Sequence, residues 1–448
     1  MTIGSFSRLR VSQNRRFLLR EDGSPFFWLG DTAWQLFHSL DRKSAERYLR
    51  DRSKKGFNVV QAVILAECDG IRTGNAYGRL PLTRNEQGEY DPELVDLTGD
   101  YTYFDHVDYV LDRAAEEGIY VALLPTWGDK YNLAHGLGPV IFNPDNARAY
   151  GRWIGERYRE RENIVWAMGG DRSLDNDEHR MVIRAMAEGI KDGDEGRHLM
   201  TFHPPGGCSS SAFVHEEEWL DFHMIQSGHG FDGLENYSRV EADYRRAPVR
   251  PVLDGEPRYE DHPKAFKAEN GYYDAADVRQ AAYWSVFAGA FGHTYGHHSI
   301  WRMSSEIGEY FVMTWQEALD RPGASQMRHV RALVESRPFL DRVPDQGLVS
   351  NQYNGHNHIR ATRGDSYAFV YSPNGLPIEV SMGRIRGESV VAHWFDPRTG
   401  RAVRIGEFKN DGTAQFIPLS HGRGDDSVLV LDDSSCDFPL PGERPYRP

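Results

Sequence analysis

Strand-like apolar segments alternate with helical or loop segments over roughly the first 330 residues, and this alternation restricts the fold more than any other feature. Eight strands are predicted, and they cover residues 26–30, 57–65, 119–127, 163–168, 198–203, 220–227, 250–257 and 289–296. Strands that alternate with helices form a parallel sheet, and eight such units fit a (β/α)8 TIM barrel. A doubly wound open sheet is the alternative, but no GxGxxG motif opens the first helix and no Walker loop is present.

The segments between the strands carry the expected helical signals. Apolar residues recur at helical spacing, or helix formers gather, over residues 41–56, 103–118, 144–162, 176–193, 234–246 and 275–287. Two strand candidates, 16–20 and 26–30, flank the turn EDGSP and predict an N-terminal β-hairpin. Residues 66–102 are rich in Gly, Asn and Thr and are predicted to be a long loop.

The pattern changes near residue 340. Short alternating runs such as HIRATRGDSYAFVYSPNG, ESVVAHWFDPRTGRAV and DSVLVLDD follow, with turn pairs between them. Such runs predict a small all-β domain, a sandwich, after the barrel. The expected organisation is therefore a catalytic barrel over residues 1–340, which includes the N-terminal hairpin, and a β-sandwich over residues 341–448.

Charge and cysteine content exclude several classes of function. A formal charge of -14 argues against nucleic acids and anionic membranes as partners, because both require a basic face. No apolar segment approaches the 18 residues of a membrane span, and no apolar leader is recognisable. Three scattered cysteines without a CxxC motif favour a reducing compartment, so a cytoplasmic protein is expected. The sequence does not indicate an oligomeric state.

Polar and aromatic residues cluster where the predicted strands end, which is where barrel enzymes place their chemistry. These candidates are Asp31, Trp34, Trp127, Asp129, Asp171, His203, Gln226, His229, Glu256, His293 and His297. Asp171 and Glu256 follow the fourth and seventh strands, which face each other across a barrel mouth. Glycoside hydrolysis needs such a pair, one carboxyl to protonate the leaving oxygen and one to act at the anomeric carbon.

Asp171 stands at the end of the segment NIVWAMGGDRS, where two glycines break the strand. A loop aspartate that caps the next helix is the simpler interpretation of an isolated GGD. Paired with Glu256, however, Asp171 is predicted to be catalytic, and Gly169 and Gly170 are predicted to let the backbone approach the sugar closely. Arg172 is expected to brace a carboxylate or the loop.

Four ordered motifs carry a specific resemblance: PFFWLGDTAW (25–34), NIVWAMGGDR (163–172), PVLDGEPRYE (251–260) and WFDPRTG (394–400). Together they span nearly the whole chain, which resembles the apiosidase-like glycoside hydrolases. This family comprises bacterial enzymes acting on pectin side chains, with a small C-terminal domain sometimes labelled collagen-binding. The resemblance implies a retaining mechanism in which Asp171 matches the acid/base and Glu256 the nucleophile. Related clans usually have Asn-Glu at the first position, so only the narrower family fits Gly-Asp.

The resemblance further implies release of apiose, or another furanose or pentose, from plant-derived glycosides or pectic oligosaccharides. A small carbohydrate is therefore the expected partner, and neither a cofactor nor a metal is expected. Packing against the barrel is the expected role of the C-terminal domain. Asp171 and Glu256 are the predicted catalytic residues. The other nine strand-end candidates are interpreted as substrate-binding. Asp31 could instead cap the first helix, and Trp34 could instead be a core residue.

Two other functions remain open. His293 and His297 lie four residues apart, and with His203 or His229 they could bind zinc in a metal-dependent hydrolase. No HExxH motif is present to support that interpretation. A carbohydrate-binding barrel without catalysis is the second alternative, and the intact acid pair argues against it.

Overall fold

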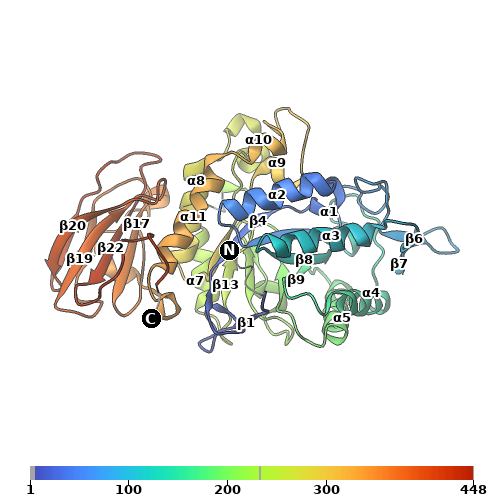
Figure 1. The fold of residues 1–448 in the computed structure, drawn as a ribbon, viewed down its shortest axis with the longest axis horizontal. Helices are drawn as coiled ribbons and strands as arrows, with labels where there is room; N and C mark the ends of the chain where they lie inside the picture. The colour runs from blue at the N-terminus through green and yellow to red at the C-terminus, as the bar shows by residue number, and fades with distance from the viewer. Residues whose placement is uncertain (1–5, 232–233, 447–448) are drawn as a thin grey trace.

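The computed structural model describes residues 6–231 and 234–446, which form a (β/α)8 barrel followed by an all-β domain (Figure 1). The predicted fold class is thereby confirmed. The barrel strands are β4 (Trp28–Thr32), β5 (Val59–Leu65), β8 (Tyr120–Thr126), β9 (Ile164–Gly169), β10 (Met200–His203), β12 (His223–Gln226), β13 (Val252–Asp254) and β14 (Gly292–Tyr295). They pair in parallel in chain order, with β14 beside β4. Hydrogen bonds from Asp221 N to Met200 O (2.8 Å) and from Thr201 Oγ1 to Phe222 O (2.7 Å) close the barrel.

The strands form because their side chains are apolar on both faces. Every residue of β5 (VVQAVIL) and of β8 (YVALLPT) is buried. A parallel strand covered by helices outside and by the barrel core inside requires such a continuous apolar run. Gln61 is the polar exception in β5, and its amide donates to the Gly255 carbonyl (2.9 Å) inside the barrel.

The helices lie outside the strands, and several begin at capping boxes, such as those at Thr102, Asn143 and Asp274. They are α1 (Leu36–Ser39), α2 (Arg42–Lys54), α3 (Tyr103–Glu116), α4 (Pro144–Tyr158), α5 (Asp177–Gly193), α6 (Ser211–Val214), α7 (Asn236–Tyr244), α8 (Ala275–Phe287), α9 (His298–Trp301), α10 (Trp315–Ala318) and α11 (Pro322–Glu335). Short 3-10 turns are η1 (Gly128–Lys130), η3 (Lys264–Phe266), η4 (Ala268–Asn270), η5 (Phe339–Asp341), η6 (Gln346–Leu348) and η7 (Gly355–Asn357). Helix α11 was not predicted, although it supplies the last barrel helix.

Two N-terminal details differ from the prediction. β1 (Leu9–Val11), β2 (Leu18–Arg20) and β3 (Pro25–Phe26) form a small antiparallel sheet, so EDGSP does turn a hairpin. Only Pro25 and Phe26 of the second arm belong to that hairpin, because the chain enters the barrel from Trp28. The predicted loop 66–102 contains a second hairpin, made of β6 (Leu82–Arg84) and β7 (Tyr90–Val95).

The C-terminal domain consists of two sheets with a shared apolar core, which includes Ile378, Val380, Trp394 and Leu429. The larger sheet has the order β15 (Val343–Pro344), β16 (Arg360–Arg363), β17 (Tyr367–Ser372), β22 (Ser427–Asp433), β19 (Ser389–Phe395) and β20 (Ala402–Lys409). The smaller sheet pairs β18 (Ile378–Ser381) with β21 (Thr413–Phe416).

The domain packs against the barrel on the side of α8 and α11 (Figure 1). Tyr283 of α8 stacks on Tyr371 of β17 with ring centroids 4.8 Å apart, and Arg279 forms a buried ion pair with Asp426 (2.6 Å). These contacts confirm the expected packing role. None of the helices in the described parts of the chain is long and apolar enough to cross a membrane.

Candidate active site

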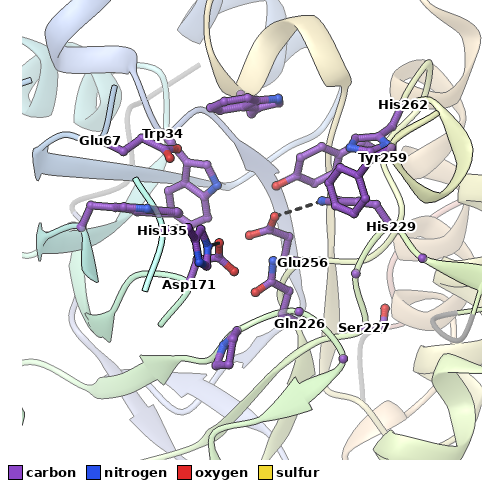
Figure 2. A pocket seen from close by; sticks show the side chains of 18 of the residues that line it. Trp34, Glu67, His135, Asp171, Gln226, Ser227, His229, Glu256, Tyr259 and His262 are labelled. Carbon is purple, nitrogen blue, oxygen red and sulfur yellow. Dashed lines mark hydrogen bonds and ion pairs between the residues drawn. The ribbon is translucent and has the colours of Figure 1, made fainter. Parts of the chain in front are cut away.

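A cavity of about 680 Å³ opens at the carboxyl ends of the barrel strands. It is lined by Trp34, Glu67, Trp127, His135, Asp171, residues 205–207, residues 226–230, Glu256, Tyr259, His262, Phe266, Trp301 and Tyr310. Figure 2 shows Asp171 and Glu256 entering from opposite walls. Of the sequence candidates, the structure brings together Trp34, Trp127, Asp171, Gln226, His229 and Glu256.

Glu256 lies just beyond β13 and is almost fully buried, at 5% exposure. Its two carboxylate oxygens are held by two imidazoles: Oε2 lies 2.7 Å from His203 Nε2, and Oε1 lies 3.2 Å from His229 Nε2. Burial on its own raises the pKa of the Glu256 carboxyl, but these two hydrogen bonds outweigh it and hold that pKa well below its usual value. Glu256 is therefore ionised at neutral pH.

His203, at the end of β10, links the two carboxyl residues. The Asp171 backbone N–H donates to His203 Nδ1 (3.2 Å), so Nδ1 is an acceptor and the ring proton lies on Nε2. That Nε2–H donates to Glu256. His203 does not line the cavity, but the rings of Trp34 and Trp127 lie against it, with centroids 5.0 and 5.8 Å away. Its place is behind the cavity wall, where it orients Glu256.

The glycine turn before Asp171 is fixed by the surrounding backbone. Gly169 and Gly170 have φ of +95° and +99°, and a Cβ on Gly169 would collide with the His203 carbonyl oxygen. A Cβ on Gly170 would lie 2.7 Å from Gly128 N. Crowding by the neighbouring backbone is therefore enough to require glycine at both positions. Asp171 itself has φ of +59°, a left-handed conformation that is uncommon outside glycine and is found at functional sites.

Two cationic or ionisable groups flank the Asp171 carboxyl. Arg172 is buried, and its guanidinium donates to Asp171 Oδ2 (3.2 Å), to the Asp171 carbonyl (2.7 Å) and to the His135 carbonyl (2.8 Å). Arg172 therefore braces the loop and the carboxylate, as predicted. The exposed His135 imidazole, from the neighbouring loop after β8, approaches Asp171 Oδ2 to 3.6 Å.

Four further sequence candidates, like His203, do not line the cavity. Asp31 is fully buried behind it, where its carboxylate accepts from Arg52 Nε (2.5 Å) and Tyr48 OH (2.6 Å). The Asp31 carboxylate therefore neither contacts a sugar nor caps a helix, because a buried charge requires a partner. Asp129 is similarly buried and accepts from Lys130 Nζ at 2.5 Å.

The two histidines of the last strand are also turned away from the cavity. His293 shares a hydrogen bond with Ser285 Oγ (2.9 Å) beneath α8, and burial lowers its pKa to about 3. His297 pairs with Asp261 (3.0 Å). Within residues 6–231 and 234–446, no group of three or more His, Cys, Asp or Glu side chains is arranged to hold a metal ion. The structure therefore does not assemble the histidine set considered for zinc.

The Asp31–Arg52 pair leads to a stability prediction. Asp31→Asn removes one of the two carboxylates that pair with the buried Arg52 guanidinium and leaves only Asp51 (2.8 Å), which we expect to lower the free energy of unfolding by about 1–3 kcal/mol. Urea unfolding of the variant, beside an exposed control such as Asp100→Asn, measures the effect. A variant of normal stability whose KM for glycosides rises would instead reinstate Asp31 as a sugar-binding residue.

A cluster of three histidine rings forms the wall beside Glu256. The rings of His229 and His262 are stacked with centroids 4.3 Å apart, and His298 meets His262 edge-on at the same distance. Burial, followed by the neighbouring imidazoles, lowers the pKa of His298 to about 3 and that of His262 well below its usual value. His262 and His298 are therefore uncharged, and their rings support His229 against Glu256.

Several cavity residues escaped the sequence analysis. Glu67 lies two residues beyond the end of β5, so the strand-end rule applied to it as to the other candidates. Tyr259 and His262 come from the loop after Glu256, and His135 from the loop after β8. No local signal marks these three, because their approach to the cavity depends on how the loops fold.

Comparisons with known proteins agree with this geometry. The family described as "Apiosidase-like, catalytic domain" matches residues 12–341, and the family described as "Putative collagen-binding domain of a collagenase" matches residues 343–432. A solved structure named "Glycoside hydrolase" is 36% identical, with a TM-score of 0.86 over 97% of this chain and 98% of that one. A glycoside hydrolase family 5 structure from Bacteroides vulgatus is 34% identical, with a TM-score of 0.88 over 98% and 96%. No curated protein matches.

Proposed function

The chain belongs to the apiosidase-like family of glycoside hydrolases, and we propose that it hydrolyses its substrate with retention, using Asp171 as acid/base and Glu256 as nucleophile. The observation that carries this proposal is the pair of carboxyl groups on opposite walls of one cavity, linked through His203. Retaining glycosidases need a carboxylate at the anomeric carbon and a second carboxyl group at the glycosidic oxygen.

In the first step, a Glu256 carboxylate oxygen attacks the anomeric carbon and the bond to the glycosidic oxygen breaks. Asp171 gives its proton to that oxygen, so the aglycone leaves as a neutral alcohol. Glu256 suits this role because it is ionised and held rigidly by His203 and His229. Both hydrogen bonds orient the attacking oxygen without the need for a general base.

In the second step, Asp171, now ionised, takes a proton from water, and the water oxygen attacks the anomeric carbon. The ester bond to Glu256 breaks and the sugar leaves with its original configuration. Asp171 is more exposed than Glu256, with 27% of its side chain accessible against 6%. Its position at the open side of the cavity suits exchange with water between the two steps.

The proposed substrate is an uncharged furanose or pentose glycoside, and apiose is the foremost candidate because of the family. Three carboxylic acids line the described cavity, with no lysine or arginine among its lining residues. Because Glu256 is ionised and no lysine or arginine lines the cavity, the carboxylate of a uronic acid would find no such counter-charge there. Trp127 Nε1 and Gln226 Oε1 are buried beside the cavity without a hydrogen-bond partner in the described structure, and both suit sugar hydroxyls.

The natural source proposed for this sugar is a plant-derived glycoside or a pectic oligosaccharide. We further propose a cytoplasmic enzyme that acts on imported short molecules, supported by three cysteines that are all free. The proposed division of the chain into a catalytic unit, 1–340, and a packing unit, 341–448, follows the change from the barrel to the β-sandwich.

A panel of 4-nitrophenyl glycosides tests the proposal. We expect the β-apiofuranoside to be cleaved with the highest kcat/KM, followed by neutral furanosides and pentosides. The glucuronide should be cleaved at least about 100-fold more slowly, because Glu256 is ionised and no lysine or arginine lines the cavity to pair with the carboxylate of the sugar. Proton NMR at early times should show a product with retained anomeric configuration. An inverted product would disprove the covalent mechanism, and preference for the glucuronide would disprove the substrate class.

A further inference from the structure

Glu67 is the third carboxyl group of the cavity, and the mechanism proposed above does not use it. It lies two residues beyond the end of β5, on the same wall as Asp171 and Trp34 (Figure 2). Its backbone carbonyl is bound by the Gln35 amide (3.3 Å) and by Gly70 N (3.2 Å), so the residue is anchored. Across the described residues, however, no hydrogen bond or ion pair engages its carboxyl group.

An unengaged carboxyl group beside other carboxylates is unfavourable when ionised. Asp171 and Asp129 come from the loops after β9 and β8, and Glu256 comes from the loop after β13. Arg172 is the opposing cation, but its guanidinium is already bonded to Asp171. Burial first, and then these carboxylates, raise the pKa of Glu67 to about 8, so that its neutral form predominates at neutral pH.

The remaining ionisable neighbours do not relieve this repulsion. Tyr310, from the loop after α9, shares the cavity wall with Glu67, and Cys68 follows it in the chain. Both groups are neutral at neutral pH, since burial raises the pKa of Tyr310 and brings that of Cys68 to about 12. Lys130, the nearest lysine behind the wall, is paired with Asp129.

We propose that Glu67 is a substrate-binding residue that acts as a neutral carboxylic acid and donates its O–H to an oxygen of the bound sugar. A neutral carboxyl group offers one donor and one acceptor, which matches a sugar hydroxyl. A structural role would require a partner for the carboxyl group, and none is present in the described chain. A perturbed, unpartnered acid in a cavity is typical of a functional site, where it is retained although it lowers stability.

This inference rests on the proposed function and is tested with the full chain and 4-nitrophenyl β-apiofuranoside between pH 5 and 10. For the wild type, kcat/KM should fall as the pH rises through about 8, because Glu67 loses its proton. Glu67→Gln cannot ionise and still carries a donor, so its alkaline decline should shift upward or disappear. Glu67→Ala should raise KM about tenfold over the whole pH range, because it removes one hydrogen bond to the sugar. Glu93→Gln, on the exposed hairpin, should match the wild type.

Thermal unfolding tests the protonation state without a substrate. Glu67 has a higher pKa in the folded protein than in the unfolded chain, so the wild type loses stability as the pH rises from about 4.5 to about 8. Glu67→Gln should therefore unfold at a higher temperature than the wild type above pH 8, and this difference should disappear below pH 4.5. If the unfolding temperatures of Glu67→Gln and the wild type differed by the same amount at every pH, the claim that Glu67 is neutral in the folded protein would be wrong.

The kinetic and thermal results separate the two proposals. If the wild type cleaves the apioside and Glu67→Ala leaves its KM unchanged, Glu67 is not a binding residue, while the proposed function stands. An alkaline decline that persists at the same pH in Glu67→Gln would likewise overturn the inference. If the wild type cleaves no glycoside of the panel, the proposed function fails, and the melting profiles still decide whether Glu67 is held neutral.

Discussion

Glu256→Gln is expected to lower kcat at least about 10⁴-fold, while substrate binding and the fold are preserved. The amide is nearly the same size as the carboxylate but cannot form the glycosyl ester. Its oxygen can still accept from His203 Nε2–H. His229 can adapt to the amide nitrogen by moving its ring proton to Nδ1, an atom without a hydrogen-bond partner in the described structure.

Steady-state kinetics on the aryl glycoside measure the loss, with Glu269→Gln as the matched control. Glu269 is exposed on the loop that follows Glu256, and its substitution should leave the rate unchanged. A 2-fluoro aryl glycoside, which slows the second step, should label Glu256 in peptide mass spectra. A variant that keeps more than about a tenth of the wild-type rate, or a label on another residue, would end the assignment of the nucleophile.

The second large effect is expected at Asp171, and its size should depend on the leaving group. Asp171→Asn and Asp171→Gly both tolerate the left-handed φ of +59°, which alanine would strain. Without the proton donor, kcat/KM for a substrate with a sugar leaving group should fall about 10²–10⁴-fold. The fall should be about tenfold or less for 4-nitrophenol, which leaves as an anion without help.

Azide provides an independent test of the same residue. It attacks the glycosyl-enzyme without a general base, so it should restore part of the rate of Asp171→Gly on the aryl substrate. The product should be a glycosyl azide with retained configuration, detectable by NMR. Asp177→Asn, on the exposed first turn of α5, is the matched control and should behave as the wild type. Equal losses on both leaving groups without azide rescue would make Asp171 a structural residue.

The barrel and the location of its chemistry could be read from the chain because both depend on local patterns. Apolar runs such as 57–65 and 119–127 are long enough to be recognised alone, and parallel strands need no long-range partner to be identified. Asp171 and Glu256 follow their strands within a few residues, so a rule about strand ends found them. Helix α11 was missed, although its first residue is Pro322 and Pro is favoured at a first helical position.

The assignment of individual side chains to the cavity was decided by contacts between distant parts of the chain. Asp31 and Asp129 stand at strand ends as Asp171 does, yet each is held outside the cavity by a buried cation, Arg52 or Lys130. Because a charge leaves water only with a partner, the position of that partner determines where the carboxylate points. Glu67 meets no such cation and therefore remains in the cavity.

The sequence by itself determined the fold class, the family and the two carboxyl residues at the strand ends. Only the tertiary structure placed His203 between Asp171 and Glu256, since this link joins residues 32 and 53 positions apart. It also showed that a Cβ on Gly169 or Gly170 would collide with the backbone of His203 or Gly128. Strand periodicity is a property of neighbouring residues, whereas hydrogen bonds and steric crowding at the barrel mouth arise only when eight separate strands converge.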